Sequence, residues 1–361
     1  MRQLPLRARH ELGGALFVDR GGWEVPASYA DLGTEVGAVR RTAGLIDHSC
    51  RVKVRVSGPQ RLPYLDRLVT RDLAALAPEH CDYTLVLNPD GTVVGDLWAY
   101  ALEDAFLLDL LPDEPQRLLD HIRRPLAGGE VAIEQLPTTA HLALHGPLAV
   151  PLARGVLGGS EPPGPGGFRT VAIGRRRSMI VAGSDCLHVP GVRFISWTDP
   201  LEGVWRALVA SGATPIGRDA WTTLRIEAGR PESGVDMGED TNALETGMAS
   251  AFSYAKGSYE GQEAISRASD RRHLNRLLLN RLLVGLRVYG DAVPARGDPV
   301  LFEGGNVGHV TSAAYSPTLR SVIALGYVRP PADEVRTHVS IVSQSWQLRA
   351  AVVSLPFVPG P

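Results

Sequence analysis

Cysteine is scarce in this sequence, and the few cysteines are poorly placed for cross-linking. Cys50, Cys81 and Cys186 are an odd number at wide spacing, with no Cys-x-x-Cys pair and no pattern of cysteine and histidine typical of a zinc site. This spacing argues against a disulfide framework and against a structural metal. We expect reduced thiols, no metal site and a cytoplasmic location.

Long apolar runs and an excess of one charge are also missing. No stretch approaches the ~20 apolar residues that a membrane helix needs. The N-terminal segment reaches Glu11 and two glycines before it can build the apolar core of a signal peptide. The formal net charge of −2 gives no electrostatic reason to bind nucleic acid. We therefore expect no membrane partner, and the sequence holds no direct evidence for a nucleic acid partner.

Lysine is nearly absent. Of 37 basic side chains only Lys53 and Lys256 are lysines, so arginine serves wherever a generic cation is enough. Lys53 alternates with Val52, Val54 and Val56 in a strand pattern, and the valines supply the buried face, so a solvated lysine is the simpler expectation there. For Lys256 we predict a functional cation, because its compact ammonium suits a crowded turn better than a planar guanidinium.

The sequence does contain the pattern of a large α+β protein. Its 361 residues, 44% of them hydrophobic, favour two or three domains. The clearest unit is a hairpin, because residues 83–88 and 92–100 are rich in strand-forming residues and are joined by the turn sequence Pro-Asp-Gly. Strands at 51–58 and 105–110 and helices at 61–76 and 114–122 complete a compact block.

The second half of the chain changes character towards its end. Residues 158–167 are so rich in glycine and proline that they predict an exposed loop, and helices are expected at 200–210 and 219–228. Residues 266–281 are strongly basic, which fits either a solvated linker helix or a site for an acidic partner such as folate polyglutamate or RNA phosphate. Short strands separated by glycine and proline then predict a small β-barrel at 276–361.

A set of short motifs in a fixed order resembles the glycine-cleavage T-protein (aminomethyltransferase) superfamily across nearly the whole chain. The motifs are Gly22-Trp23 with Pro26 and Tyr29, Gly44–Ser49, Ser57-Gly58-Pro59, Thr70-Arg71-Asp72, Tyr83-Thr84, Leu224–Gly229, Asp240-Thr241 with Glu245, Thr311-Ser312, and Ser316–Leu319. No single motif decides the matter, whereas the colinear set is specific.

The resemblance implies a fold class and a domain plan. The expected fold is α+β, a three-domain disc around a central folate channel, with two interleaved α+β domains followed by a C-terminal β-barrel. The first domain would combine residues 1–50 with 140–225, the second 51–139 with 226–270, and the barrel would cover 276–361. Tetrahydrofolate, or another folate derivative, is the implied cofactor and partner.

Four positions depart from the T-protein pattern. The family's catalytic aspartate aligns with Gly95, and only the second acid, Asp96, remains. Neighbouring strand residues point to opposite faces, so we expect the Asp96 carboxylate to point away from the channel, which leaves it a weak catalytic candidate. The pterin-binding glutamate aligns with Arg193, which can donate hydrogen bonds but accepts none. Trp221 and Leu111 replace an arginine and an asparagine.

These departures make the chain similar to the YgfZ-type branch of the superfamily, which assists iron–sulfur enzymes and tRNA modification. Three segments carry that likeness, namely Asn88–Gly91, Leu224–Pro231 and the motif Lys256–Glu263. Ser258 stands where the branch has a cysteine, and a hydroxyl lacks the low pKa and soft sulfur of a thiol.

The motif Lys256–Glu263 has two interpretations. It could be a tight turn between the second and third domains, with Gly257 and Gly261 present for backbone reasons and Tyr259 packed. The alternative is a site wall, in which Lys256 offers a charge and Gln262 and Glu263 offer paired hydrogen bonds.

Two functions are compatible with these motifs and departures. The favoured one is a tetrahydrofolate-binding, YgfZ-like accessory protein with a possible iron–sulfur client protein. The alternative is a tetrahydrofolate-dependent aminomethyltransferase or methyltransferase. The candidate folate-binding residues are Tyr83, Asn88, Asp96, Arg193, Trp221 and Arg225.

Overall fold

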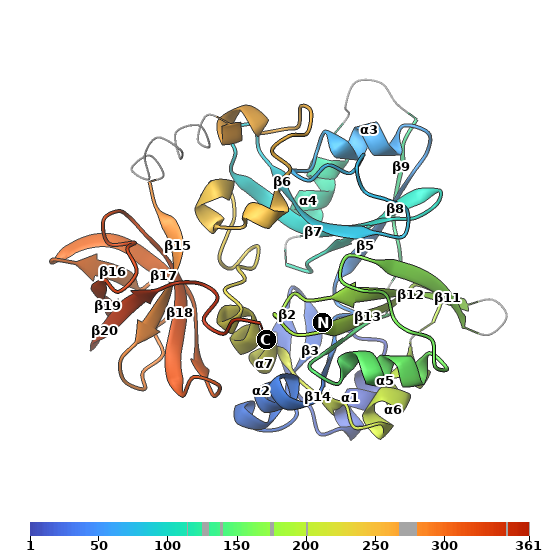
Figure 1. Cartoon of the computed structure of the whole chain (residues 1–361), viewed down its shortest axis with the longest axis horizontal. Coiled ribbons are helices and arrows are strands. Elements are labelled where there is room, and N and C mark those ends of the chain that lie inside the picture. Colours follow the sequence, from blue (N-terminus) through green and yellow to red (C-terminus); the bar gives the residue numbers. More distant parts are fainter. Residues whose placement is uncertain are drawn as a thin grey trace.

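Three bodies meet around a common centre in the computed structural model. It describes residues 1–113, 115–124, 130–137, 140–173, 177–199, 201–266, 280–343 and 346–360. In Figure 1 a five-stranded module lies at the top, a six-stranded module at the bottom, and a barrel at the left. This arrangement is the predicted α+β class with a C-terminal barrel. Among the described helices, none has the length and apolar character needed to span a bilayer.

The five-stranded module contains an antiparallel sheet with the order β6-β7-β8-β5-β9. Its strands are β5 (Val52–Ser57), β6 (Cys81–Leu87), β7 (Val93–Ala101), β8 (Ala105–Leu110) and β9 (Ala132–Gln135), and its helices are α3 (Arg61–Asp66) and α4 (Pro115–Ile122). The predicted hairpin is confirmed, since Tyr83 pairs with Trp98 across β6 and β7.

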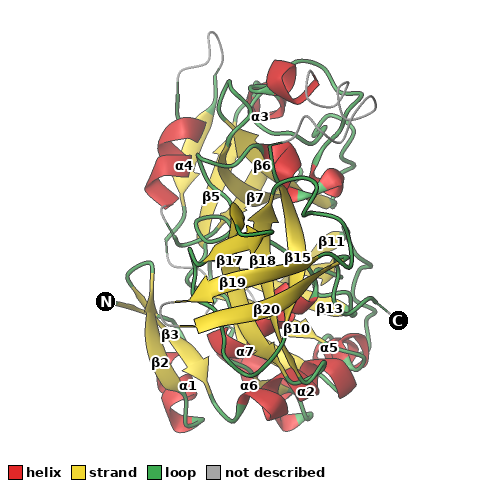
Figure 2. Cartoon of the chain, turned by 90° about the vertical axis from the view of Figure 1, so that its left-hand side faces the viewer, coloured by secondary structure: helices red, strands yellow, loops and turns green. Residues whose placement is uncertain are grey.

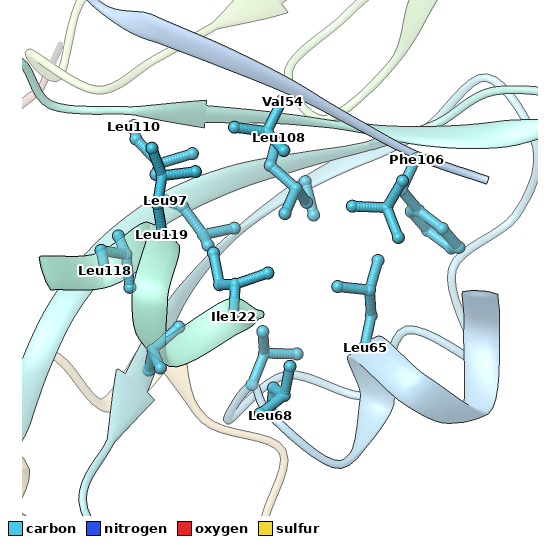
Figure 3. Packing of buried hydrophobic residues seen from close by; sticks show 14 of the residues in the cluster. Val54, Leu65, Leu68, Leu97, Phe106, Leu108, Leu110, Leu118, Leu119 and Ile122 are labelled. Atoms are coloured by element: carbon cyan, nitrogen blue, oxygen red, sulfur yellow. The ribbon is translucent and has the colours of Figure 1, made fainter. Parts of the chain in front are cut away.

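One face of this sheet is covered by the two helices. Leu97 and Leu108 point from the strands towards Leu65 of α3 and Leu119 of α4, as Figure 3 shows. Because side chains alternate along a strand, the residues between them point to the opposite face, towards the centre of the molecule. The helical face is therefore a dry core, and the other face is free to build a site.

The six-stranded module contains a sheet with the order β11-β12-β13-β10-β4-β14. Its strands are β4 (Gly44–Asp47), β10 (Ala140–His145), β11 (Phe168–Ile173), β12 (Arg177–Ser184), β13 (Gly191–Ser196) and β14 (Thr214–Pro215). Its helices are α1 (Arg7–Leu12), α2 (Leu32–Arg41), α5 (Ala149–Val156), α6 (Glu202–Ala210) and α7 (Arg218–Glu227). A small sheet of β1 (Arg2–Gln3), β2 (Leu16–Arg20) and β3 (Trp23–Ser28) lies beside it.

The barrel closes the chain and is attached to α7. Its strands are β15 (Leu282–Val288), β16 (Pro299–Phe302), β17 (Gly305–Ser316), β18 (Ser321–Val328), β19 (His338–Ser343) and β20 (Trp346–Val353). The barrel faces the viewer in Figure 2. Ser316 of β17 donates to Glu227 at the end of α7, at 2.5 Å. The C-terminal segment returns to the same residue, because the Val358 amide donates to the Glu227 carbonyl.

Some segments differ from what their local sequence predicts. The helix expected at 61–76 ends at Asp66, because the following carbonyls turn towards a buried lysine instead of continuing the helix. Short 3₁₀ turns at Ala243–Thr246 and Ala249–Ala251 fill the segment before the barrel. Most of the basic segment, residues 267–279, lies outside the described residues. The domain boundaries stay a prediction, and we propose that they follow the five-stranded module, the six-stranded module and the barrel.

Candidate functional site

A cavity of about 70 Å³ lies between the inward faces of the two sheets, beside α7 and the segment that follows it. Its wall is rich in charged and aromatic side chains and contains Arg20, His48, Arg51, Asp96, Trp98, Asp109, Leu111, His141, Ala143, His145, Cys186, Arg193, Trp221, Arg225, Arg230, Pro231 and Glu232. A cavity lined by this many ionisable groups is typical of a ligand site.

Strand β7 presents Asp96 and Trp98 to the cavity, and Gly95 to the helical core. A Cβ atom at position 95 would lie 3.1 Å from the side chain of Leu118 in α4. The expectation that Asp96 points away from the channel is therefore wrong. The alternation of the strand was right, but the sequence alone did not show which of its two faces packs against the helices.

The Asp96 carboxylate is buried and retains one unpaired oxygen. Its Oδ1 has no hydrogen-bond partner among the described residues. Burial raises the pKa of Asp96, while Arg51, the Tyr83 hydroxyl and Arg230 favour the charged form and oppose that rise. A carboxyl group with a raised pKa and a free oxygen can exchange a proton with a ligand.

Behind this group lies a buried ionic network centred on Asp109. Arg51 Nε and Lys53 Nζ lie 2.8 and 2.9 Å from Asp109 Oδ1. Burial alone would raise the pKa of Asp109, but the two cations outweigh it and hold that pKa far below its ordinary value. Lys53 is only 1% exposed, so the expectation of a solvated lysine is wrong. Its strand is covered on both faces, by helices on one and by the six-stranded module on the other.

Three histidines that were not predicted from the sequence also line the cavity. Burial lowers the pKa of His48, His141 and His145, the last to about 3, so all three are neutral at pH 7. The His48 and His145 rings lie 4.5 and 5.7 Å from the ring of Trp221. The signal was the spacing of His141 and His145, which places both on one face of a strand.

Arg193 of β13 occupies the position where the resemblance implied a pterin-binding carboxylate. Its guanidinium carbon lies 3.9 Å from the centre of the Trp98 ring, a stacked cation–π contact. Nη2 donates to the Gly183 carbonyl at 3.2 Å, whereas Nε is buried without a partner among the described residues. The side chain is 5% exposed.

The remaining predicted folate-binding residues divide into two groups. Trp221 and Arg225 lie in the cavity wall, and Arg225 is fixed by Asp236 at 2.6 Å. Tyr83 lies behind the wall, where Arg230 covers its ring at 4.5 Å. Asn88 does not contribute to the wall, since its side chain donates to Thr92 within the hairpin turn.

Comparison with known proteins decides the family. Residues 6–171 match the GCVT N-terminal domain, and residues 281–359 match the glycine cleavage T-protein C-terminal barrel domain. The chain is 33% identical to an aminomethyltransferase of Rubrobacter xylanophilus, over 99% of this chain and 94% of that protein. This chain belongs to the glycine cleavage T-protein family.

Other members of the T-protein family agree in length and shape. An aminomethyltransferase of Symbiobacterium thermophilum is 32% identical over all of this chain and 98% of its own length. The crystal structure of glycine cleavage system aminomethyltransferase T from Bartonella henselae superposes with a TM-score of 0.89 at 24% identity, covering 99% of this chain and 98% of that one. The structural likeness supports the fold, and the sequence identity to these relatives establishes the family.

These relatives overturn the favoured function. The matching proteins are named aminomethyltransferases, and the match covers nearly their full length. The prediction of a YgfZ-like accessory protein is therefore wrong. An iron–sulfur client and a role in tRNA modification lose their support with it. The three short segments were misleading because they are local, whereas the match to T-proteins extends along the whole chain.

The motif Lys256–Glu263 has a structural explanation. Lys256 Nζ donates to the Asp66 carbonyl at 2.6 Å, the Val69 carbonyl at 2.9 Å and the Arg71 carbonyl at 2.7 Å. Tyr259 packs in an apolar cluster beside the hairpin. None of the eight residues, all of which are described, lies in the cavity wall.

Backbone constraints account for the rest of the motif. Gly261 has φ +84°, and a Cβ there would lie 2.7 Å from the Asn88 carbonyl, so only glycine fits. The Gln262 amide donates to the Lys256 carbonyl at 3.4 Å, while Gly257, Ser258 and Glu263 are exposed. The interpretation as a packed turn therefore accounts for these contacts, and the interpretation as a site wall does not.

The family's cofactor suits the polar groups that the cavity leaves unpaired. Aminomethyltransferases of the T-protein family use tetrahydrofolate, in agreement with the predicted cofactor. Within the described residues, Asp96 Oδ1 is a buried acceptor without a donor, and both ring nitrogens of His145 lack a hydrogen-bond partner. His141 Nδ1 lies 3.6 Å from Asp109 Oδ2, too far for a hydrogen bond, and His141 Nε2 has no hydrogen-bond partner. Each unsatisfied buried group costs about 1 to 3 kcal/mol, so a ligand with both N–H and carbonyl groups fits this wall.

Proposed function

We propose that this protein is a tetrahydrofolate-dependent aminomethyltransferase or methyltransferase. The observation that carries the proposal is the Asp96 carboxylate, buried in the cavity with a free Oδ1 and a raised pKa. A T-protein needs a carboxylate at the centre of the molecule, and Asp96 supplies one although its neighbour is Gly95. The full-length relatives named aminomethyltransferase support the same class of reaction.

Several side chains in and behind the wall have distinct tasks in this proposal. Tetrahydrofolate, when bound, supplies the nitrogen atoms that accept the one-carbon unit. Asp96 Oδ1 receives or returns the proton that leaves when the unit is transferred. Burial raises the pKa of that carboxyl group, and Arg51, the Tyr83 hydroxyl and Arg230 limit the rise. The Trp98 and Trp221 rings offer flat apolar faces to a heteroaromatic ring.

The ionic network behind the wall fixes the position of the acid. Arg51 Nε donates to Asp109 Oδ1 at 2.8 Å, and Arg51 Nη2 donates to the backbone carbonyl of Asp109 at 3.0 Å. Burial of this network away from water strengthens its electrostatic effect on the cavity. Arg51 and Asp109 are therefore positioning residues in this proposal. The cytoplasmic location stays a prediction.

The test measures turnover of tetrahydrofolate with three candidate donors. Purified protein is incubated with tetrahydrofolate and a lipoyl-bound aminomethyl, methylamine or O-methyl donor, and methylene- and methyl-tetrahydrofolate are quantified. One donor is expected to give product, and Asp96→Asn should lower the rate about 10²- to 10⁴-fold. The matched control is Asp104→Asn, a largely exposed carboxylate paired with Arg55. Turnover by Asp96→Asn at the wild-type rate would refute the role of Asp96.

A further inference from the structure

A second cavity, of about 240 Å³, lies between the barrel and the segment that follows α7. Strands β17 and β18 contribute His309 and Tyr327 to its wall, and the turn before β16 contributes Arg296. Residues between 234 and 241 form much of the opposite wall. No residue of this wall also lines the central cavity between the two sheets, so the two sites are separate.

The Tyr327 hydroxyl is a buried donor in this wall. The residue is only 1% exposed, and its hydroxyl oxygen has no hydrogen-bond partner among the described residues. Burial raises the pKa of Tyr327, so the phenol is protonated at pH 7 and can donate. Because a buried hydroxyl without an acceptor destabilises the fold, its place in a cavity wall indicates that a ligand supplies the acceptor.

Arg296 and His309 add two more polar groups beside this hydroxyl. The centres of the His309 and Tyr327 rings lie 6.1 Å apart, and the two residues pair across β17 and β18. Arg296 is held near them, since the next amide, of Gly297, donates to the Val310 carbonyl at 2.8 Å. Its exposed guanidinium pairs with no carboxylate among the described residues. Burial lowers the pKa of His309, and the positive charge of Arg296 lowers it further, so the neutral ring can donate one hydrogen bond.

The carboxylates of the wall are already engaged. The Asp236 carboxylate accepts at Oδ1 from two hydroxyl groups of β17 and at Oδ2 from Arg225, each at 2.6 Å. Asp240 is the other carboxylate; its Oδ1 accepts from the neighbouring threonine at 3.1 Å, and Arg281 Nη2 lies 3.8 Å from its Oδ2. The wall therefore presents donors and one unpaired positive charge to a ligand, which favours an acceptor with negative charge.

We propose that this second cavity binds a small ligand with an oxyanion group, either a phosphate or a carboxylate, with Arg296 as the cation and the Tyr327 hydroxyl and His309 ring as neutral donors. Charge-assisted hydrogen bonds from a guanidinium are strong, and its planar fork matches either oxyanion. The cavity is far larger than the ~10 to 15 Å³ that one water needs, so the ligand can extend beyond a single ion. The site goes beyond the proposed function, which places tetrahydrofolate in the central cavity.

The first test is a calorimetric titration at constant ionic strength, with inorganic phosphate and acetate as probes. Tighter binding of phosphate would identify a phosphate ligand, and tighter binding of acetate a carboxylate. Arg296→Gln should weaken binding of the tighter probe by about 10- to 100-fold. Arg287→Gln, an exposed arginine of β15 outside this cavity, is the matched control and should bind like the wild type. Binding of neither probe, or unchanged binding by Arg296→Gln, would overturn the proposal.

Tyr327→Phe distinguishes a hydroxyl that binds a ligand from one that supports the fold. Because the hydroxyl has no partner without a ligand, its removal should leave the Tm unchanged or slightly higher. A bound ligand raises the Tm by mass action, so the rise that the tighter probe produces in the wild type should shrink in this variant. A lowered Tm with an undiminished probe-dependent rise would show that the hydroxyl is structural and would overturn its role in binding.

Discussion

Lys256 offers a sharp test of whether a conspicuous motif residue serves function or stability. Its side chain is almost completely buried, and its ammonium meets three backbone carbonyls and the Asp66 carboxylate. The carbonyls belong to the end of α3 and the turn that follows it. We predict that Lys256→Met destabilises the protein without removing a group from the cavity, which contradicts the functional cation inferred from composition.

The expected magnitude follows from the contacts that are lost. Hydrogen bonds from a charged donor contribute about 1.5 to 3 kcal/mol each, so three at the lower end give about 4 to 5 kcal/mol, the range for breaking a buried ion pair. An unfolding entropy of about 2.1 cal/mol/K per residue, applied to this chain, converts that loss to a fall in Tm of about 6 °C. Lys256→Arg retains the charge but not the compact shape, so its fall should be smaller.

Thermal unfolding by circular dichroism and tetrahydrofolate turnover below the Tm are measured together. Arg67→Met is the matched control, since Arg67 is exposed in the same turn and loses the same charge. The control should melt like the wild type, and Lys256→Met should retain turnover while it is folded. A Lys256→Met protein with an unchanged Tm and lost turnover would refute the structural role.

Two more predictions concern strand β7. Gly95→Asp places a carboxylate against Leu118 in the apolar core, so it should lower the free energy of unfolding by about 1 to 3 kcal/mol in a denaturant titration and give no gain in turnover; a gain would show that position 95 faces the ligand. Burial raises the pKa of Asp96. If the rate needs the ionised carboxylate, the acid limb of the pH–rate profile should lie at a higher pH than the pKa of an ordinary aspartate. Tyr83→Phe removes a hydrogen bond to the charged form, so it should move this acid limb to still higher pH. An acid limb centred below about pH 4 in the wild type would contradict this.

Much of the fold could be predicted because the patterns that specify it lie within a few neighbouring residues. The turn at Pro89–Gly91 fixed the hairpin, since its glycine has φ +83°. The spacing of glycine and proline after residue 281 indicated the barrel, which the six paired strands confirm. Helix ends were harder, because α3 stops where a lysine 190 residues away in sequence binds its carbonyls.

The cavity could not be predicted in the same way, because its wall is assembled from distant segments. The alternation of β7 is visible in the sequence, but only the packing of Leu97 against α4 shows that Asp96 faces inward. His141 and His145 carried a period of two without any local sign that Trp221 lies against His145 or that Arg193 of the neighbouring strand shares their face. Sequence patterns show which neighbouring residues share a face of a strand, and tertiary contacts show which of the two faces points into the cavity.

The surroundings of the two lysines explain why these positions are not arginines. Both are buried and both direct a compact ammonium group at oxygen atoms, Lys53 at Asp109 and Lys256 at the carbonyls after α3. Arginine, with its planar fork, lines the cavity and forms the paired contacts around Glu232. In a chain with 37 basic residues, lysine therefore remains where a small, enclosed cage of oxygens leaves no room for a guanidinium. The rarity of lysine drew attention to Lys256, but it did not reveal that this cation stabilises the turn after α3 and that Lys53 is buried beside Asp109.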